Sequence, residues 1–282
     1  MTLPYDPGRR ALYRPEERPS VFTSPVLNDL QLCTEASRLA YLRFEESTTE
    51  RTQLADALDL AGFNHKLTHF VDAATDGAGF GVMNNAMGTA LLVFRGTQPD
   101  HLLDLLTNLQ FFHAHWSLGT GQVHRGFKMT AINLWAQVSA WLQGPALSRS
   151  RLIICGHSLG AAIATLLAKP ASANLLVTLG SPRVGDPDFV ASLAGLHSIR
   201  IVDCCDLVTS LPPDFLDYQH VGQLHYVDLN GFVHLSPSEP FMTHDQQQAV
   251  QFYEAHYKPQ PGNVVTRRLA DHAPFNYVRA LW

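Results

Sequence analysis

Apolar and polar positions alternate along this chain with two periods, one typical of helices and one typical of strands. The predicted strands cover residues 67–71, 79–83, 89–94, 152–155, 175–179 and 198–202. The predicted helices cover residues 27–42, 54–61, 127–143, 159–168, 186–193, 244–257 and 271–281. Residues 223–235 carry an Asn-Gly pair between two alternating runs, a pattern that predicts a β-hairpin.

The order of these elements predicts an α/β protein. Runs of four to six apolar residues alternate with helices, which is typical of strands that are buried on both faces. We therefore expect a mainly parallel central sheet with helices on both faces. Residues 1–24 are rich in Pro and Arg and predict an extended N-terminal arm, whereas residues 25–282 contain no repeat or linker and predict a single domain.

Composition narrows the function classes. The net charge of -5 gives no electrostatic reason to bind nucleic acid, so no such partner is expected. The four cysteines lack the paired spacing of a zinc site, and neither a metal nor another cofactor is expected. The chain predicts no transmembrane segment, and prolines and charges fill the N-terminus where a signal peptide needs an apolar stretch. We therefore expect a cytoplasmic protein; the oligomeric state is not predicted.

One short segment carries the candidate chemistry, and it reads RLIICGHSLG at residues 151–160. A predicted strand runs directly into the motif and a predicted helix leaves it. A serine at the tip of such a sharp turn is exposed to substrate, but the crowded turn needs small residues two positions before and after it. Gly156 and Gly160 meet that need, so the motif predicts a nucleophile elbow with Ser158 as the nucleophile. The N–H of Leu159 would then point at the substrate oxygen.

Six segments in a characteristic order carry a family resemblance. They are LLVFRGT (91–97), VHRGF (123–127), GHSLG (156–160), VTLGSPRVGD (177–186), DLVTSLPP (206–213) and ADHAPFNYV (270–278). With them the chain resembles the class 3 lipases, the fungal-type triacylglycerol lipase branch of the α/β-hydrolases. The resemblance implies an α/β-hydrolase fold and hydrolysis of acyl-lipid esters such as acylglycerols by a Ser-His-Asp acyl-enzyme mechanism without a cofactor. It also implies transient contact with a lipid interface.

Other activities fit the same motifs. A phospholipase A or an acyltransferase would use the same three catalytic residues on a different lipid or a different acceptor. A catalytically silent module that binds lipid or protein is a further alternative, since fold alone does not determine function.

The resemblance also assigns the oxyanion donors and the acid. It implies that Thr97, together with Leu159, stabilises the oxyanion. The motif D-x-V-x-x-x-P-P favours Asp206 over Asp203 as the acid. Its position agrees, because Asp203 would end its strand whereas Asp206 lies in the following loop, where a carboxylate can reach a histidine above the sheet edge.

The base is expected after the acid, in the hydrolase order Ser, Asp, His. His244 and His272 both precede helical segments on apparent turns, where an imidazole can be aimed. The family ending resembles D-H-x-x-x-Y, which Asp271, His272 and Tyr277 match with slightly altered spacing, so the resemblance favours His272.

The segment that follows Thr97 carries several leucines at helical spacing. The resemblance implies a lid in this region, and we expect Leu102, Leu105 and Leu106 to line an acyl-chain groove. An ordinary surface helix packed on the sheet is the alternative.

Overall fold

The computed structural model describes residues 3–23, 28–98 and 110–282 of the chain. Its centre is an eight-stranded sheet with the strand order β1-β2-β3-β6-β7-β8-β9-β10. The strands are β1 (His65–Asp72), β2 (Gly77–Asn84), β3 (Thr89–Phe94), β6 (Arg151–His157), β7 (Leu175–Leu179), β8 (His197–Asp203), β9 (Gln223–Val227) and β10 (Val233–Leu235). Neighbours from β3 to β9 pair in parallel, and the pairs at the two edges are antiparallel.

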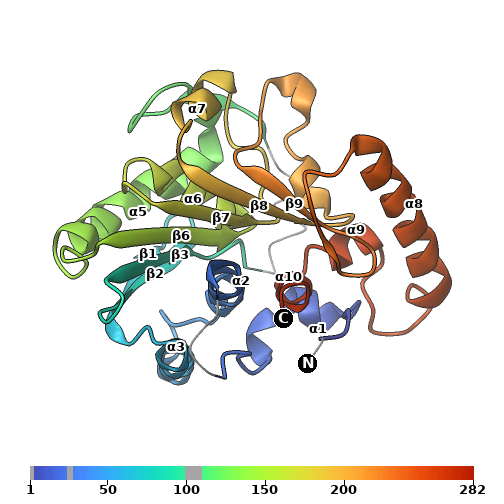
Figure 1. Cartoon of the computed structure of the whole chain (residues 1–282), viewed down its shortest axis with the longest axis horizontal. Helices are drawn as coiled ribbons and strands as arrows, with labels where there is room; N and C mark the ends of the chain where they lie inside the picture. The colour runs from blue at the N-terminus through green and yellow to red at the C-terminus, as the bar shows by residue number, and fades with distance from the viewer. Residues whose placement is uncertain (1–2, 24–27, 99–109) are drawn as a thin grey trace.

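Helices cover both faces of this sheet (Figure 1). They are α1 (Arg9–Tyr13), α2 (Asp29–Leu39), α3 (Thr48–Leu60), α5 (Arg125–Gln143), α6 (Leu159–Ala168), α7 (Pro187–Ser192), α8 (Glu239–His256), α9 (Arg267–Ala270) and α10 (Pro274–Arg279). Helices α5 and α6 lie on one face, and α2, α3 and α10 lie on the other. None of the helices in the described ranges is long and apolar enough to cross a membrane.

The alternation of side chains along the strands explains the two covered faces. Leu92 and Ile154 pack into the core beneath α5 and α6, whereas their neighbours Leu91 and Ile153 pack into the core beneath α2. Successive residues of a strand point to opposite faces, so a strand that is apolar throughout must be covered twice. The predicted parallel sheet with helices on both faces is therefore confirmed.

The N-terminal segment differs from the extended arm that its composition predicts. Residues Arg9–Tyr13 form the short helix α1, because Ala11 and Leu12 pack into a small apolar core with residues near the C-terminus such as Phe275. The amide of Asp6 donates to Oδ1 of Asn276 at 3.0 Å. The first residues of the described chain thus contact α10, its last helix, through apolar packing and a hydrogen bond.

The predicted helix over 271–281 is shorter in the structure, where it corresponds to α10 alone. Helix α9 ends at Ala270, and α10 begins at Pro274, whose ring lacks the N–H that would continue a helix. His272 lies in the break between the two. A small additional sheet of β4 (His113–His115) and β5 (Gln122–His124) was not predicted, because strands of three residues carry too little periodicity.

Candidate active site

Ser158 occupies a tight turn between β6 and α6. Its backbone has φ 59° and ψ −126°, a conformation that residues other than glycine rarely adopt. A Cβ atom at Gly156 would overlap the backbone of Gly160, and one at Gly160 would overlap the backbone of Phe94. The turn therefore requires glycine on both sides of the serine, which is the physical basis of the motif in the sequence.

His272 and Asp206 lie in line with the serine hydroxyl. Nε2 of His272 is 2.9 Å from Oγ of Ser158, and its Nδ1 is 2.9 and 2.8 Å from the two carboxylate oxygens of Asp206. Since a carboxylate only accepts, Nδ1 carries a proton and Nε2 is left to accept from the serine hydroxyl. All three residues are buried. The arrangement can remove the serine proton as the oxygen attacks a carbonyl carbon.

The two alternative residues lie elsewhere. Asp203 is fully buried at the end of β8, and within the described part of the chain neither of its carboxylate oxygens has a hydrogen-bond partner. Burial and the nearby Asp271 raise the pKa of Asp203 well above its ordinary value. His244 is exposed on α8. The structure thus brings Asp206 and His272, and not Asp203 and His244, to the serine.

Tyr277 forms a hydrogen bond with the candidate acid, Asp206. Its hydroxyl donates to Oδ2 of Asp206 at 2.5 Å and accepts from the amide of Asp203 at 3.2 Å. Gly180, with φ +56°, leaves the room that this pair needs, because a Cβ atom there would lie 2.7 Å from Oδ2 of Asp206. Tyr277 stands in a segment that the sequence singles out, but the motif does not indicate which atom it contacts.

A second aromatic pair supports the base. The ring of His157 lies 4.5 Å from the ring of His272, and Nδ1 of His157 is 2.8 Å from the hydroxyl of Tyr41. Burial and the proximity of His272 hold the pKa of His157 well below its ordinary value, so this imidazole stays neutral. No local pattern in the sequence identifies Tyr41, because it lies in another part of the chain, next to α2.

Two candidate oxyanion donors flank the serine. Leu159 is the first residue of α6, where backbone N–H groups have no acceptor within the helix. Thr97 follows Gly96, whose Cα is so close to Ser158 that an added Cβ would lie 3.1 Å from the serine Cβ. Among the described residues, the buried hydroxyl of Thr97 has no hydrogen-bond partner. The predicted groove residues Leu102, Leu105 and Leu106 lie outside the described residues.

Comparisons with known proteins find one family that part of the chain resembles. A family model described as Lipase (class 3) matches residues 91–216. Residues 91–216 are thus similar to the class 3 lipases. The family segment contains both Ser158 and Asp206, whereas His272 follows it.

Two curated proteins illustrate the similarity. A lipase of Rhizomucor miehei is 30% identical to the chain over 160 residues, and a secreted mono- and diacylglycerol lipase of Fusarium solani is 34% identical over 135 residues. These matches cover 50% and 44% of the chain but only 42% and 40% of the relatives. The solved structure of Rhizomucor miehei triacylglyceride lipase is 22% identical, has a TM-score of 0.62, and is matched over 86% of this chain and 90% of its own. The predicted α/β-hydrolase fold is confirmed.

The class 3 lipase relatives also correct one prediction. The expectation of a cytoplasmic protein is wrong, because the relative from Fusarium solani is a secreted enzyme. The expectation rested on prolines and charges near the first residue, and the absence of an apolar stretch does not determine a protein's compartment.

One group of side chains outside the candidate active site has metal-binding atoms close together. Donor atoms of Cys204, Cys205 and Asp271 lie within 4.8 Å of one another in the described part of the chain. Both carboxylate oxygens of Asp271 are already 3.0 Å from Nε of Arg267, and Oδ2 also accepts from the amide of Cys205. The guanidinium would repel a cation, so the group fits a metal poorly.

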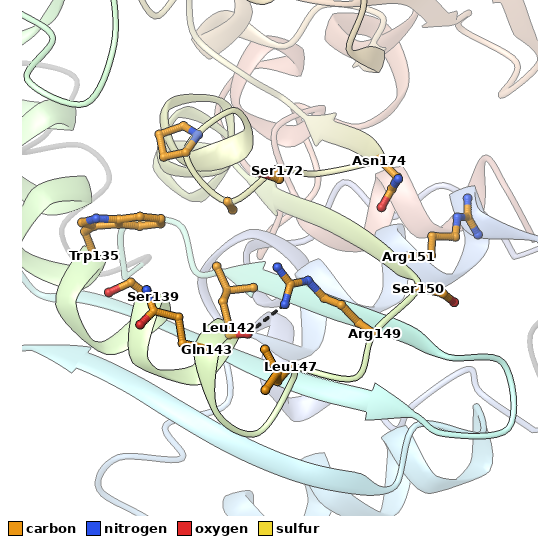
Figure 2. Close-up of a pocket in the computed structure, with 12 residues that line it drawn as sticks. Trp135, Ser139, Leu142, Gln143, Leu147, Arg149, Ser150, Arg151, Ser172 and Asn174 are labelled. Carbon is orange, nitrogen blue, oxygen red and sulfur yellow. Dashed lines mark hydrogen bonds between the residues drawn. The ribbon is translucent and has the colours of Figure 1, made fainter.

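A surface cavity of about 520 Å³ has none of the candidate catalytic residues in its lining (Figure 2). Trp135, Leu147, Arg149 and Asn174 are among the residues that line it, and the side chain of Arg149 donates to the carbonyl of Leu142 at 2.8 Å. The cavity opens at the amino ends of β6 and β7, whereas ligands of open α/β sheets bind at the carboxyl ends. It is therefore not part of the candidate active site.

Proposed function

We propose that this chain hydrolyses carboxylic esters of lipids, such as acylglycerols, through an acyl-enzyme on Ser158. The observation that carries the proposal is the 2.9 Å contact between Oγ of Ser158 and Nε2 of His272, with Asp206 on the other side of the imidazole. Names of two relatives, a lipase and a mono- and diacylglycerol lipase, support the substrate class.

The reaction follows from the positions of the three side chains. His272 takes the hydroxyl proton while Oγ of Ser158 attacks the ester carbonyl, and Asp206 stabilises the imidazolium that results. The imidazolium then gives its proton to the departing alcohol, which leaves the acyl group on the serine. Water, deprotonated by the same imidazole, releases the acid and restores the serine.

We assign Thr97 and Leu159 as the donors that stabilise the oxyanion. The N–H of Leu159 is free of an acceptor within its helix, and the buried hydroxyl of Thr97 is unpaired among the described residues. Donors that are already in place cost no reorganisation, and each is worth about 3 kcal/mol in the transition state. Replacing Thr97 with Val removes its hydroxyl and leaves the backbone donor, so we expect a partial loss of turnover.

Contact with a lipid surface is part of this proposal. Phe112 and Phe215 are 54% and 80% exposed. Phe112 directly precedes β4, which pairs with β5, and β5 is bridged to Gly185 in the loop after β7. Phe215 lies in the loop that follows β8 and Asp206. Both aromatic rings therefore belong to segments at the carboxyl edge of the sheet, where the serine lies, and they are available to touch a lipid interface transiently.

The experiment compares hydrolysis of p-nitrophenyl esters of increasing chain length and of emulsified glycerides by the chain and by Ser158→Ala. We expect Ser158→Ala and His272→Ala to lose turnover and His244→Ala, altered on the exposed face of α8, to keep it. A fluorophosphonate that labels the parent chain but not Ser158→Ala would support the nucleophile.

The alternatives give different results in the same assays. Preferred cleavage of phospholipid would indicate a phospholipase A. Transfer of the acyl group to an added alcohol in preference to water would indicate an acyltransferase. Failure of the fluorophosphonate to label Ser158 would favour a silent binding module and contradict the proposal.

A further inference from the structure

Two adjacent cysteines lie between β8 and the candidate acid. Cys204 and Cys205 follow Asp203 directly and precede Asp206. Both are free cysteines, and their sulfur atoms lie 3.6 Å apart. Cys204 has φ 28°, in the region that residues other than glycine rarely adopt. None of the steps assigned to Ser158 uses either thiol.

Cys205 is the less buried member of the pair, with 9% of its surface exposed against 1% for Cys204. It lines a surface cavity of about 530 Å³ together with Asp206, Gln246 and Arg268. Its thiol donates to the carbonyl of Gln246 at 3.6 Å, across the cavity wall. A small molecule in this cavity would therefore meet the sulfur of Cys205 and the loop of the candidate acid together.

Cys204 is buried beside a carboxylate. Its thiol donates to Oδ2 of Asp245 at 3.2 Å, and the hydroxyl of Tyr226 donates to the same oxygen at 2.7 Å. The hydrogen bond to Cys205 and burial raise the pKa of the Cys204 thiol, so Cys204 keeps its proton until a base removes it. Asp245 is positioned to be that base.

We propose that Cys204 and Cys205 form a redox modification site, in which a low-molecular-weight disulfide oxidises the two thiols to a disulfide between neighbouring residues. The thiolate of Cys205 attacks the reagent, its S–S bond breaks, and one reagent thiolate leaves and takes up the proton that Cys205 released to solvent. Cys204 then transfers its proton through Asp245 and attacks the sulfur of Cys205, which expels the second reagent thiol. Two protein thiols are oxidised and one reagent disulfide is reduced to two thiols.

The geometry makes this disulfide reversible. A disulfide needs a sulfur separation of about 2.05 Å and Cα atoms about 4.4–6.8 Å apart, whereas adjacent Cα atoms are only about 3.8 Å apart. The product is strained, and strained disulfides are easily reduced. A thiol reductant should therefore restore the original state.

Closing the ring would also disturb the candidate acid. The sulfurs must move together by roughly 1.5 Å to reach bonding distance, and Asp206 is the next residue along the chain. The amide of Cys205 donates to Oδ2 of Asp271, the residue before His272, at 3.0 Å. A displacement of about 1 Å in a catalytic group costs about 100-fold in rate. This loss of turnover rests on the proposed function, whereas disulfide formation does not.

The experiment treats the purified chain with glutathione disulfide, then measures the mass of the tryptic peptide that begins at Ile201 and the rate of p-nitrophenyl ester hydrolysis. We expect the peptide to lose two hydrogen atoms and turnover to fall at least about ten-fold, with both changes reversed by dithiothreitol. Cys205→Ser should keep its turnover and ignore the reagent. Cys204→Ser should stop at a mixed disulfide on Cys205, and Cys33→Ala, altered outside the pair, should respond as the parent chain does.

Three results would overturn the inference. The peptide with both cysteines could stay reduced, the two hydrogen atoms could be lost from peptides that contain Cys33 and Cys155, or the disulfide could form with turnover unchanged. If the untreated chain has no esterase activity, the proposed function fails, and the peptide mass still decides whether the thiol pair is oxidised.

Discussion

The hydroxyl of Tyr277 joins the carboxylate of Asp206 to the amide of Asp203, donating to one at 2.5 Å and accepting from the other at 3.2 Å. The other oxygen of Asp206 accepts from the amide of Val208 at 2.9 Å. These two hydrogen bonds, one to each oxygen, fix the orientation of the carboxylate toward His272. A hydrogen bond to a charged group in a buried site contributes about 1.5–3 kcal/mol.

Tyr277→Phe should therefore lower both stability and turnover. We expect the free energy of unfolding to fall by about 1–3 kcal/mol and kcat/KM for a short-chain ester to fall about ten-fold. Tyr253→Phe is the matched control. The hydroxyl of Tyr253 donates to the carbonyl of Val264 at 2.7 Å, and in the described structure that hydroxyl forms no hydrogen bond with the three candidate catalytic side chains. The control should lose stability and keep kcat/KM; equal kcat/KM in both variants would show that Tyr277 does not position the acid.

Asp206→Asn and Asp203→Asn should behave in opposite ways. Replacing Asp206 leaves the imidazole without its carboxylate, and loss of such an acid lowers kcat about 10⁴-fold. The carboxylate of Asp203 has no hydrogen bond to His272 in the described structure, so Asp203→Asn should retain most of the turnover. Ester hydrolysis under saturating substrate would distinguish the two, and a severe loss in Asp203→Asn alone would reassign the acid.

Asp203→Asn should also change the pH dependence of stability. Burial raises the pKa of Asp203 in the folded state above its unfolded value, so the folded chain binds a proton that the unfolded chain releases. Its contribution to stability is therefore present below about pH 3.8 and is lost as pH rises toward the folded pKa. Denaturant unfolding should show that the variant gains stability over the parent as pH increases.

Gly180→Ala tests the room behind the triad. A Cβ atom there would lie 2.7 Å from Oδ2 of Asp206 and 3.2 Å from Nδ1 of His272, so the acid and base must shift. Gly195→Ala is the control, since Gly195 has φ +88° and no atom within 4 Å of an added Cβ. Both variants should lose about 1–2 kcal/mol to backbone strain. Only Gly180→Ala should lose turnover; retained turnover would mean that the site absorbs the extra methyl group.

His124 should make the fold sensitive to mild acid. Its Nδ1 accepts from the amide of Phe127 at the start of α5, and burial lowers its pKa from 6.5 to about 4. The unfolded chain therefore binds a proton that the folded chain does not, and this contribution to stability is lost as pH falls from about 6.5 to about 4. His124→Asn keeps an acceptor at the helix start. It should reduce the slope of stability against pH in this window by up to about 1.4 kcal/mol per unit; an unchanged slope would contradict the assignment.

The sequence predicts those parts of the molecule that depend on local pattern. Strands β3, β6 and β7 are buried along almost their whole length because both faces are covered, and their runs of apolar residues are visible without any structure. The turn at Ser158 is equally local, since its two glycines are needed to avoid overlap with backbone.

Contacts between distant segments could not be predicted in the same way. His244 and His272 both precede helical patterns, and only the fold shows that one is exposed on α8 while the other lies in the break before α10. The supporting contacts of Tyr41 depend on where α2 packs against the sheet, which no short window of residues determines. The thiol pair is visible in the sequence, but its cavity is not.

The hydrogen bond from Tyr5 to Asp271 spans 266 positions of the chain. During synthesis Tyr5 emerges from the ribosome long before its acceptor exists, and the imidazole of His272 is made 114 residues after the serine hydroxyl that it contacts. Nascent chains therefore carry the serine turn well before they carry the imidazole that the proposed mechanism requires.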